Sequence, residues 1–360
     1  MRRKLHRKDK KQKKIIISLS IFLVLFLSAG YAAFQTNISL KAKGNIVQKK
    51  MKINDLIKTV VTSGDGLYVD DTESERYIYK GVEPNNYIKL DSDIYRIISI
   101  ESDGTLKVIK NKSIGNIPFD LGYISSISGV TDRNSVIGTR YTNTSTDYCS
   151  FIPGTESEYY GCNIWGSKTT MLDSSGNNIT QMPKTIGGTT LYNLPEKEAY
   201  INTYLNSTWL NTLSADVQNK ITNHIFNVGL IQNGETSLSN TISQEQTYKW
   251  KGKVGLMTIS DYIKTNTNME QCGSFSLNNT NYSTCKATSW IFNSVNFNWL
   301  LTSSPDSYFF NHRLYHITSN GKFELFSPLD TISTLPVFYL SSDIYLKGKG
   351  TANVPYRLVA

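Results

Sequence analysis

The stretch IYRIISIESDGTLKVIK, residues 94–110, decides the fold more than any other part of this sequence. Apolar and polar residues alternate on both sides of its central segment ESDGT, residues 101–105. Alternation with period two is typical of a β-strand with one buried face, and a short turn that contains Asp-Gly is typical of a β-hairpin. The stretch therefore predicts two antiparallel strands joined by this turn.

Further strands are expected on both sides of the hairpin, because short alternating or apolar runs stand there between turn residues. Some lie close to the hairpin, and others lie toward the end of the chain. The runs are ERYIYKG (75–81), NYIKL (86–90), KWKGKVGLMTI (249–259), NWLLTSSPD (298–306), HRLYHITSNGKFELF (312–326), TLPVFYLSSDIYL (334–346) and YRLVA (356–360).

Helical spacing is found mainly in the middle of the chain. Large apolar and aromatic side chains recur at helical intervals between Tyr200 and Leu213, and Ser214 is the expected N-cap of the next helix. Ser260 is the expected N-cap of a short helix in SDYIKT, and Asn54 that of an earlier helix. Strands at both ends flank this helical middle, so the predicted fold class is α+β.

Positive charge is concentrated at the N-terminus. Residues 1–14, MRRKLHRKDKKQKK, hold nine of the 38 Lys and Arg residues and one of the 29 Asp and Glu residues. The rest of the chain therefore has 29 basic and 28 acidic residues, a net charge of +1. Nucleic-acid binding requires basic residues clustered on the folded domain, so no nucleic-acid partner is predicted.

Residues 15–34, IIISLSIFLVLFLSAGYAAF, are uncharged and predict a transmembrane or signal helix. A helix of this length spans about 30 Å, the hydrocarbon thickness of a bilayer. The basic tail, residues 1–14, is expected to stay in the cytoplasm by the positive-inside rule, which places the rest of the chain outside. The length of the run favours a retained membrane anchor. Cleavage would instead release a secreted protein, with either Gly30 and Ala32 or Ser28 and Gly30 at the −3 and −1 positions of the peptidase site.

Four cysteines in an exported chain predict disulfide bonds. Cys149 and Cys162 lie thirteen residues apart, and Cys272 and Cys285 have the same separation. Sequence alone permits three pairings. The nearest-neighbour pairing would close two short polar loops, and each bond would contribute about 3 kcal/mol in the chain-entropy account. The tight C-x₂₋₄-C pairs of a zinc site are missing, so structural disulfides are expected.

The composition divides the exported part into a stalk and a domain. Residues 35–64 begin with a short alternating stretch and are expected to form the stalk. Residues 65–360 are expected to form the extracellular domain. Within it, residues from about 125 to 190 are rich in Ser, Thr, Asn and Gly without a lasting period, which predicts a long surface insertion.

Several stretches, in this order along the chain, resemble a family of exported proteins of low-GC Gram-positive bacteria whose function is unknown. The hairpin region resembles the family's W-R-I-I-x-I-x-x-D-G-x-L-K-I-I segment, with Tyr95 at the usual position of Trp. The last apolar element is similar to the family's R-P-V-x-x-L, with Leu335 in place of Arg. The other matching stretches are SAGYAAFQTNISLKAKGNI (28–46), YIYKGVEPNNYIKL (77–90), YLNSTWLNTL (204–213), KVGLMTISDYI (253–263) and WLLTS (299–303).

The resemblance implies a C-type-lectin-like domain, the fold shared with formylglycine-generating enzymes. That fold is a small twisted sheet with two helices, and long loops present a variable face. The family supplies no known activity, and a fold does not supply one by itself. The chemistry of formylglycine-generating enzymes depends on paired C-terminal cysteines. It is not transferred here, because Cys272 and Cys285 precede the last strands and enclose a polar loop.

No metal site or cofactor is predicted. The tripeptide EPN, Glu83–Asn85, matches a calcium-dependent lectin motif, but those lectins carry it in a late loop before a W-N-D strand that this chain lacks. Between two early strands, Pro-Asn is typical of a turn. His312 and His316 have zinc-helix spacing, yet Arg313 follows the first histidine where Glu is required. They are expected to be exposed polar residues of a strand.

No catalytic residues are predicted, and the chain is not expected to be an enzyme. It has four histidines, one of them in the basic tail, and contains no G-x-S-x-G or Cys-His pattern. An enzyme of unrecognised chemistry is kept as an alternative. Its structural sign would be a buried cluster of acidic groups or histidines in one pocket.

A ligand-binding face is predicted in residues 304–316, SPDSYFFNHRLYH. Tyr308, Phe309 and Phe310 are adjacent there and Arg313 is close, and aromatic and Arg side chains are the usual anchors of protein and glycan contacts. Trp290 and Trp299 are near in sequence. For these two tryptophans, burial in the core is the expected role.

These features together favour an exported cell-surface protein, held by residues 15–34 in the membrane, whose domain recognises an extracellular glycan, matrix component or surface protein without catalysis. The ligand's identity is left open. A structural subunit of an extracellular fibre or matrix is the main alternative. In that case the signal would be cleaved, and the mature chain would start near Ala33.

Overall fold

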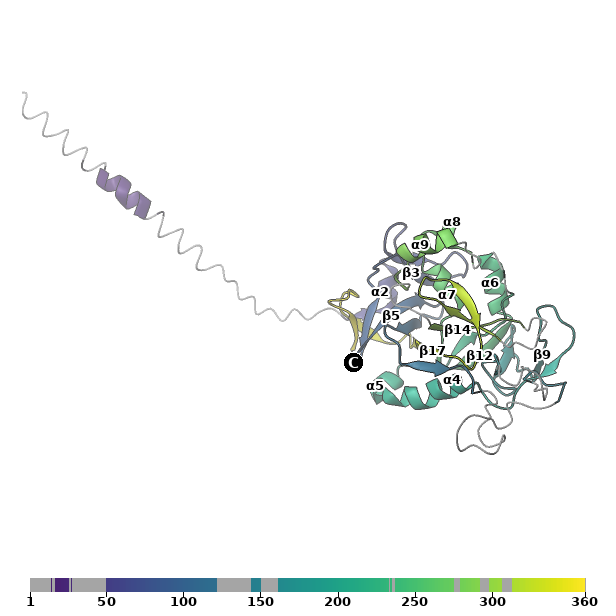
Figure 1. Ribbon diagram of the computed structural model, residues 1–360. Coiled ribbons are helices and arrows are strands. Elements are labelled where there is room, and N and C mark those ends of the chain that lie inside the picture. Colours follow the sequence, from purple (N-terminus) through teal and green to yellow (C-terminus); the bar gives the residue numbers. More distant parts are fainter. Residues whose placement is uncertain are drawn as a thin grey trace, which may run out of the picture. The chain divides into compact units, whose positions relative to one another are not determined.

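Strands β5 (Asp93–Ile100) and β6 (Leu106–Lys110) form the predicted hairpin in this computed structural model (Figure 1). The Glu101 N–H donates to the Thr105 carbonyl at 2.9 Å and closes the turn. Gly104 has a φ of +79°, a left-handed conformation that glycine adopts without steric cost. The turn chemistry of the sequence thus accounts for the hairpin directly.

The hairpin lies in the middle of a ten-stranded sheet with the order β1-β19-β20-β4-β5-β6-β18-β13. The remaining two strands lie off this path. Strand β3 pairs with β5 on the same side as β4 does, and β2 pairs with β3. The other strands are β1 (Met51–Lys52), β2 (Gly66–Val69), β3 (Tyr77–Lys80), β4 (Tyr87–Leu90), β13 (Val254–Gly255), β18 (Val337–Leu340), β19 (Tyr345–Lys347) and β20 (Tyr356–Val359).

Three smaller sheets complete the β-structure. One has the order β16-β15-β14-β17-β7, a second the order β11-β12-β8, and the third pairs β10 with β9. Their bounds are β7 (Asn116–Pro118), β8 (Met171–Asp173), β9 (Gln181–Met182), β10 (Tyr192–Asn193), β11 (His224–Asn227), β12 (Tyr248–Gly252), β14 (Asn298–Ser303), β15 (Leu314–Ile317), β16 (Phe323–Phe326) and β17 (Thr331–Ser333).

Short helices connect the sheets, and the molecule is α+β, as predicted. They are α2 (Ile53–Ile57), α4 (Tyr200–Thr203), the π-helical turn η3 (Tyr204–Trp209), the 3₁₀ turn η4 (Leu210–Thr212), α5 (Ala215–Gln218), α6 (Leu238–Glu245), α7 (Ile259–Lys264), α8 (Met269–Cys272) and α9 (Asn279–Ala287).

Three predicted helix starts have different outcomes. Ser214 is the N-cap of α5, since its hydroxyl accepts from the Val217 N–H. The prediction for Ser260 is wrong, because Thr258 is the N-cap of α7. Helix α2 begins at Ile53, so Asn54 lies inside it and not at its cap. In α7, Thr258 and Asp261 form a capping box, which satisfies two backbone N–H groups at once.

The central hairpin is buried on both faces, although its alternation predicts one exposed face. Strand β6 is buried at every position, including Lys107 and Lys110. Arg96 on β5 is buried between two aromatic rings, with its guanidinium 3.7 Å from the Tyr87 centroid and 4.7 Å from that of Trp290. Burial lowers the pKa of Arg96 to about 10. Polar side chains are tolerated here because neighbouring groups pack against them.

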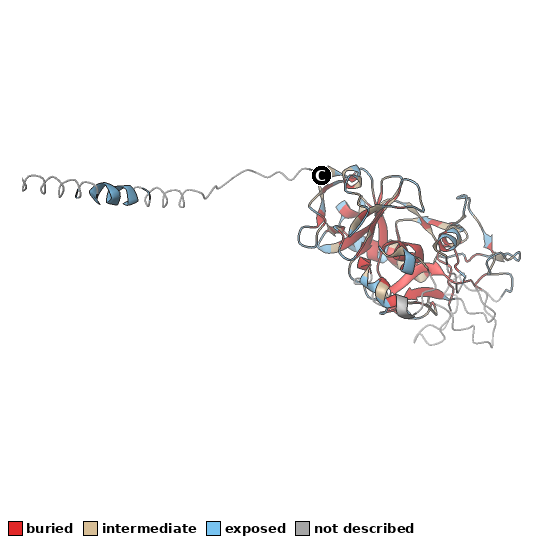
Figure 2. Cartoon of the chain, turned by 90° about the horizontal axis from the view of Figure 1, so that it is seen from above, coloured by how far each residue is buried: buried red, intermediate tan, exposed pale blue. Residues whose placement is uncertain are grey.

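One hydrophobic core extends through the large sheet and the helices, and the buried residues follow the strands (Figure 2). Trp290 and Trp299 are both in this core, as predicted. The indole N–H of Trp299 donates to the Ile117 carbonyl at 2.8 Å, and that of Trp290 donates to the Tyr79 carbonyl at 2.9 Å. Both of these indoles therefore have their polar atom satisfied.

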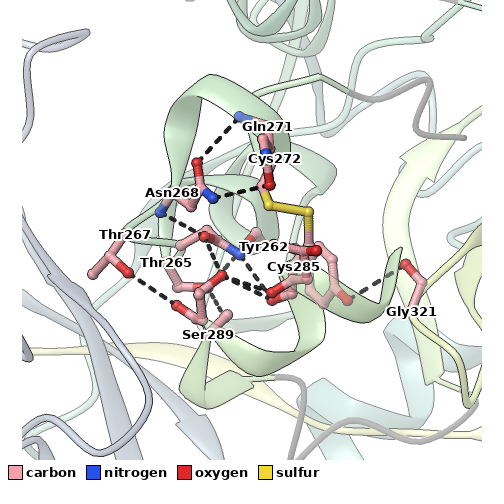
Figure 3. The surroundings of a disulfide bond; sticks show 12 residues. Tyr262, Thr265, Thr267, Asn268, Gln271, Cys272, Cys285, Ser289 and Gly321 are labelled. Carbon is pink, nitrogen blue, oxygen red and sulfur yellow. Dashed lines mark hydrogen bonds between the residues drawn. A yellow bond between two sulfur atoms is a disulfide. The ribbon is translucent and has the colours of Figure 1, made fainter. Parts of the chain in front are cut away.

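The four cysteines form the nearest-neighbour disulfides, Cys149–Cys162 and Cys272–Cys285, with Cα atoms 5.5 Å apart in each pair. The second bond joins α8 to α9, and Figure 3 shows it beside Asn268 at the start of α8. The Asn268 side chain accepts from the Gln271 N–H and caps that helix. The bond thus fixes α8, of 4 residues, against α9, of 9 residues.

The chain divides into two compact units, Met1–Gln48 and Lys49–Ala360, and the sheets described above belong to the second. Strand β1 and helix α2, from the predicted stalk 35–64, are part of this second unit. No helix in the described part of the chain is both long and apolar enough to cross a membrane. The structure describes residues 14, 17–25, 27, 50–121, 144–149, 161–232, 234, 237–274, 279–291, 298–305 and 313–359.

Candidate functional site

Only one of the four predicted binding residues is among those that the structure describes. Arg313 is exposed directly before β15. Tyr308, Phe309 and Phe310 lie outside the described residues, so their grouping with Arg313 stays a prediction.

The residues that flank this predicted site are held tightly together. The Ser304 N–H donates to the Arg313 carbonyl at 3.0 Å. The buried Asn163 side chain donates to the carbonyls of both Ser304, at 2.9 Å, and Arg313, at 3.2 Å. The Ser303 hydroxyl donates to the Asn163 carbonyl at 2.6 Å. The buried amide of Asn163 therefore holds Ser304 and Arg313 close together.

Asn163 also connects these flanking residues to two other parts of the chain. It follows Cys162, which is bonded to Cys149, and the Cys162 N–H donates to the Asp120 carboxylate at 3.0 Å. Asp120, Cys149 and Cys162 flank two further long segments, 122–143 and 150–160. The ends of three long segments are thus fixed beside one another by one disulfide and a set of buried hydrogen bonds.

A polar cleft of about 470 Å³ lies next to the Cys149–Cys162 bond. Its volume is within the range of about 300–1,000 Å³ that is usual for small-molecule sites. Cys149, Leu194 and Pro195 supply its buried apolar surface. The polar side chains that line it are Asp147, Lys168, Thr169, Asn178, Thr180, Asn193 and Glu196.

Backbone hydrogen bonds hold the walls of the cleft in place around residues 193–195. The Asn193 carbonyl accepts from the Tyr148 N–H at 2.8 Å. The Leu194 N–H donates to the Thr180 carbonyl at 2.8 Å, and the Pro195 carbonyl accepts from the Lys168 N–H at 2.9 Å. Residues 193–195 therefore bind three other segments of the chain, and the cleft is preformed.

The charged side chains of the cleft are partly exposed. The Lys168 ammonium lies 2.5 Å from the Glu196 carboxylate, and their side chains are 40% and 46% exposed. The Asn193 amide donates to the Asp147 carboxylate at 2.8 Å, and its oxygen accepts from Gln181 at 2.7 Å. The described lining of the cleft thus contains one lysine and two carboxylates.

A second group of ionisable residues is buried beneath α7, and we call it the charge cluster. It has three cations and four carboxylates that come from the strands of the large sheet, the loops beside them and α7. Its members are Asp70, Glu73, Arg76, Glu101, Lys107, Asp261 and Lys264.

Each cation of the charge cluster contacts a carboxylate. Arg76 lies 2.6 Å from Asp70, 3.0 Å from Glu101 and 3.4 Å from Asp261. Lys107 lies 2.6 Å from Asp261. Lys264 lies 3.2 Å from Asp70. The side chains of these residues are between 2% and 14% exposed, so water contributes little to their solvation.

These contacts keep the paired groups charged. Burial opposes the charge of Asp261, but Lys107 and Arg76 outweigh burial and hold the pKa of Asp261 well below its usual range. Burial likewise opposes the charge of Lys107, but Asp261 outweighs it and raises the pKa of Lys107. An amide bond between the two side chains would need a neutral amine and a protonated carboxyl. Both pKa shifts oppose that reaction, so the pair acts as a structural contact.

Glu245 at the end of α6 is the other fully buried carboxyl near α7. Its Oε1 accepts from the Ile259 N–H at 2.9 Å and from the Thr302 hydroxyl at 2.8 Å, and the Ser260 hydroxyl donates to its Oε2. Burial raises the pKa of Glu245 in spite of these donors. The contacts tie α6 to the start of α7 and to β14, a structural role.

The prediction that His316 is exposed is wrong, because it is fully buried in β15. Its Nδ1 lies 2.9 Å from the Glu324 carbonyl, and its ring packs edge-on against Phe326 at 4.2 Å. His312 lies outside the described residues. In the described part of the chain, no group of three His, Cys, Asp or Glu side chains could hold a metal ion.

Most of the cleft was missed by reasoning from the sequence. Asp147, Asn178, Thr180 and Asn193 belong to or border the Ser, Thr and Asn-rich insertion, which shows no period that would align them. The signal that pointed to this region was the cysteine pair, since Cys149 lines the cleft. Comparison of the chain with protein-family models, curated proteins and solved structures finds no match.

Proposed function

We propose that this chain is an exported cell-surface protein whose domain recognises an extracellular glycan, matrix component or surface protein without catalysis. In this proposal residues 15–34 anchor it in the cell membrane, with the N-terminus in the cytoplasm and the domain outside. The uncharged run of residues 15–34 and the basic tail before it support the orientation. The two disulfides fit an oxidising, extracellular setting.

The observation that carries the proposal is that described residues at the ends of segments 122–143, 150–160 and 306–312 are bonded to one another. Asn163 and the Cys149–Cys162 bond fix the ends of these segments, and the preformed polar cleft lies beside that bond. Binding residues are commonly placed on loops that a rigid scaffold positions. Arg313, the described member of the predicted binding face, is exposed directly after segment 306–312.

We include in the proposal a C-type-lectin-like domain. The sequence resemblance supports it, whereas the ten-stranded sheet of the described residues is larger than the small sheet of that fold. No catalytic role is included, since the buried acidic groups of the charge cluster are paired with cations.

The test is binding of the full chain, purified with its disulfides oxidised, to an array of glycans and matrix proteins with and without EDTA. We expect saturable binding to one class of ligand. Arg313→Ala and Tyr308→Ala should each weaken it at least several-fold, because Arg and Tyr commonly anchor interfaces. Arg357→Ala is the matched control, since Arg357 is an exposed arginine on β20.

Binding that neither variant changes would remove the predicted face from the proposal. Loss of binding with EDTA would show a cation requirement that the described residues do not explain. No binding to any arrayed ligand would contradict the recognition role and favour the fibre subunit. Mass spectrometry of the mature N-terminus would then decide, because the fibre alternative requires a chain that starts near Ala33.

A further inference from the structure

We infer that the outer face of strands β1, β19, β20 and β4 docks onto anionic lipid headgroups of the membrane that holds the chain. We call this surface the basic face, and it consists of Lys52, Lys89, Tyr345, Lys347 and Arg357. The inference rests on one part of the proposed function, the membrane anchor at residues 15–34, and goes beyond the recognition role. It does not depend on the polar cleft.

The register of the strands places three cations in one row. Lys347 on β19 is the cross-strand partner of Arg357 on β20, and Arg357 is that of Lys89 on β4. Cross-strand partners point to the same face of a sheet, and successive residues of a strand point to opposite faces. The residues that directly precede the three cations are buried in the core: Leu346, Tyr356 and Ile88. The row therefore lies on the opposite face, away from this part of the core.

The charges of this row are not neutralised by the residues that the structure describes. Among those residues, no carboxylate lies within ion-pair distance of Lys89, Lys347 or Arg357. Asp93, which begins the neighbouring strand β5, instead lies 2.5 Å from the Lys110 ammonium. Like charges on directly opposed residues destabilise a sheet. An anionic surface placed against the row would offset this repulsion.

The remainder of the basic face suits a lipid surface in particular. Lys52 on β1 is the cross-strand partner of Tyr345 on β19, and its ammonium lies 6.0 Å from the ring centroid. Tyr345 is 37% exposed, and Val354 in the loop between β19 and β20 is 38% exposed. Tyrosine is enriched where a membrane meets water. Cations beside exposed apolar groups match a headgroup layer, which presents anionic charge above apolar chains.

The chain connects the basic face directly to the proposed anchor. Strand β1 begins at Met51, two residues after the start of the compact unit Lys49–Ala360, and is an edge of the large sheet. Only residues 35–49 separate this unit from the proposed anchor at residues 15–34. A stretch of that many residues cannot exceed about 50 Å even when fully extended. Contact of the face with the same membrane is therefore intramolecular, which gives a weak contact a high effective concentration.

The test reconstitutes the oxidised full chain in lipid nanodiscs, made either of phosphatidylcholine alone or of an equal mixture of phosphatidylcholine and phosphatidylglycerol. Surface lysines are acetylated with a water-soluble reagent, and mass spectrometry measures the rate at each lysine. Phosphatidylglycerol should slow the labelling of Lys89 and Lys347 roughly five-fold or more, since several cations meet the anionic surface together. High salt should remove this protection. Lys251, exposed on β12 in a different sheet, should label equally in both discs.

A triple variant tests the row of cations. Lys89→Gln, Lys347→Gln and Arg357→Gln remove its three charges together, and Lys52 and Lys349 remain as reporters on β1 and in the loop after β19. Phosphatidylglycerol should protect both reporters in the unchanged chain. That protection should be lost in the triple variant, because too little positive charge is left to hold the face on the headgroups.

The matched control removes the same charge elsewhere. Lys197→Gln, Lys251→Gln and Lys286→Gln change three exposed lysines that lie outside the four strands, and this variant should keep the protection. Near-ultraviolet circular dichroism of both triple variants checks that the fold is kept. Equal loss of protection in the two variants would overturn the basic face, because total charge rather than its position would then hold the domain on the lipid.

The outcomes distinguish this inference from the proposed function. A chain that does not stay with phosphatidylcholine discs would contradict the anchor and, with it, this inference. A chain that stays but labels equally at Lys89 in both discs would overturn the inference and leave the recognition role intact. Protection by a DNA duplex on phosphatidylcholine discs, with none from phosphatidylglycerol, would overturn it in favour of a nucleic acid. Loss of array binding in Arg357→Ala would overturn it in favour of an arrayed ligand.

Discussion

The charge cluster and the polar cleft contain the same kinds of residues at the same spacing, yet they are suited to different tasks. Lys107 and Asp261 in the cluster are 2.6 Å apart, and Lys168 and Glu196 in the cleft are 2.5 Å apart. The first pair is 8% and 4% exposed, whereas the second is 40% and 46% exposed. The distance between the charges is therefore not what distinguishes a stabilising contact from a binding surface. The difference lies in how deeply the pair is buried and in how many other charged groups contact it.

The largest expected effect is on the cluster. Arg76→Met should lower the free energy of unfolding by about 3–5 kcal/mol, because it leaves buried carboxylates without one of their cations. Urea unfolding of the full chain measures the change. Ligand affinity of the folded variant should not change.

The matched control is Lys58→Met, since Lys58 and Asp55 are also 2.6 Å apart but Lys58 is 75% exposed. That variant should lose less than about 1 kcal/mol. Equal losses in the two variants would show that burial does not decide the contribution of these pairs.

The two disulfides allow a second comparison between the cleft and the rest of the fold, because both close loops with a sequence separation of 13 residues. Replacement of either pair by serines should lower the free energy of unfolding by about 3 kcal/mol. Only the Cys149, Cys162 double variant should also weaken ligand binding, since Cys149 lines the cleft. Cys272 and Cys285 join α8 to α9, which contribute no described residue to it. Equal loss of binding in both variants would argue against the cleft.

Local chemistry explains which parts of the fold could be predicted from the sequence. The 94–110 hairpin and the helical region that follows Tyr200 depend on alternation, helical spacing and turn residues within a few positions. The cap of α7 was misplaced by two residues, because both Thr258 and Ser260 are good cap residues. Asp261, three residues after Thr258, was the signal that distinguished them.

The parts that could not be predicted depend on contacts between distant segments. His316 looked exposed from the alternation of its strand, but β16 and Phe326 cover it. Lys107 likewise stands at a position that alternation assigns to solvent, and Asp261, 154 residues later, is its partner. Backbone hydrogen bonds around Asn193 bring four separate segments together at the cleft, so no period in the sequence predicts it.

The acid stability of the protein should be governed by the cluster. Lys264 and Arg76 lower the pKa of Asp70 against the effect of burial, and Lys107 and Arg76 do the same for Asp261. The unfolded chain then binds protons first as the pH falls, so stability is fully present well above pH 3.8, the ordinary value for Asp, and declines below it. Urea unfolding as a function of pH measures the decline.

Asp261→Asn should make the decline shallower, because one of the groups with a lowered pKa is removed. Glu245 has the opposite sign, since burial raises its pKa above the ordinary value of 4.5. Its contribution falls as the pH rises from that value through the higher pKa of the folded state. A profile that Asp261→Asn leaves unchanged would place the origin of the acid decline outside the cluster.

The smallest expected effect on stability is in the cleft. Lys168→Met should change the free energy of unfolding by less than about 1 kcal/mol, because the pair with Glu196 is close to half exposed and water solvates both charges. Urea unfolding of the full chain measures the change.

This result would complete the contrast with Arg76→Met, which is expected to change stability and leave affinity unaltered. If Lys168→Met destabilised the fold by several kcal/mol, the cleft would be part of the structural scaffold like the cluster.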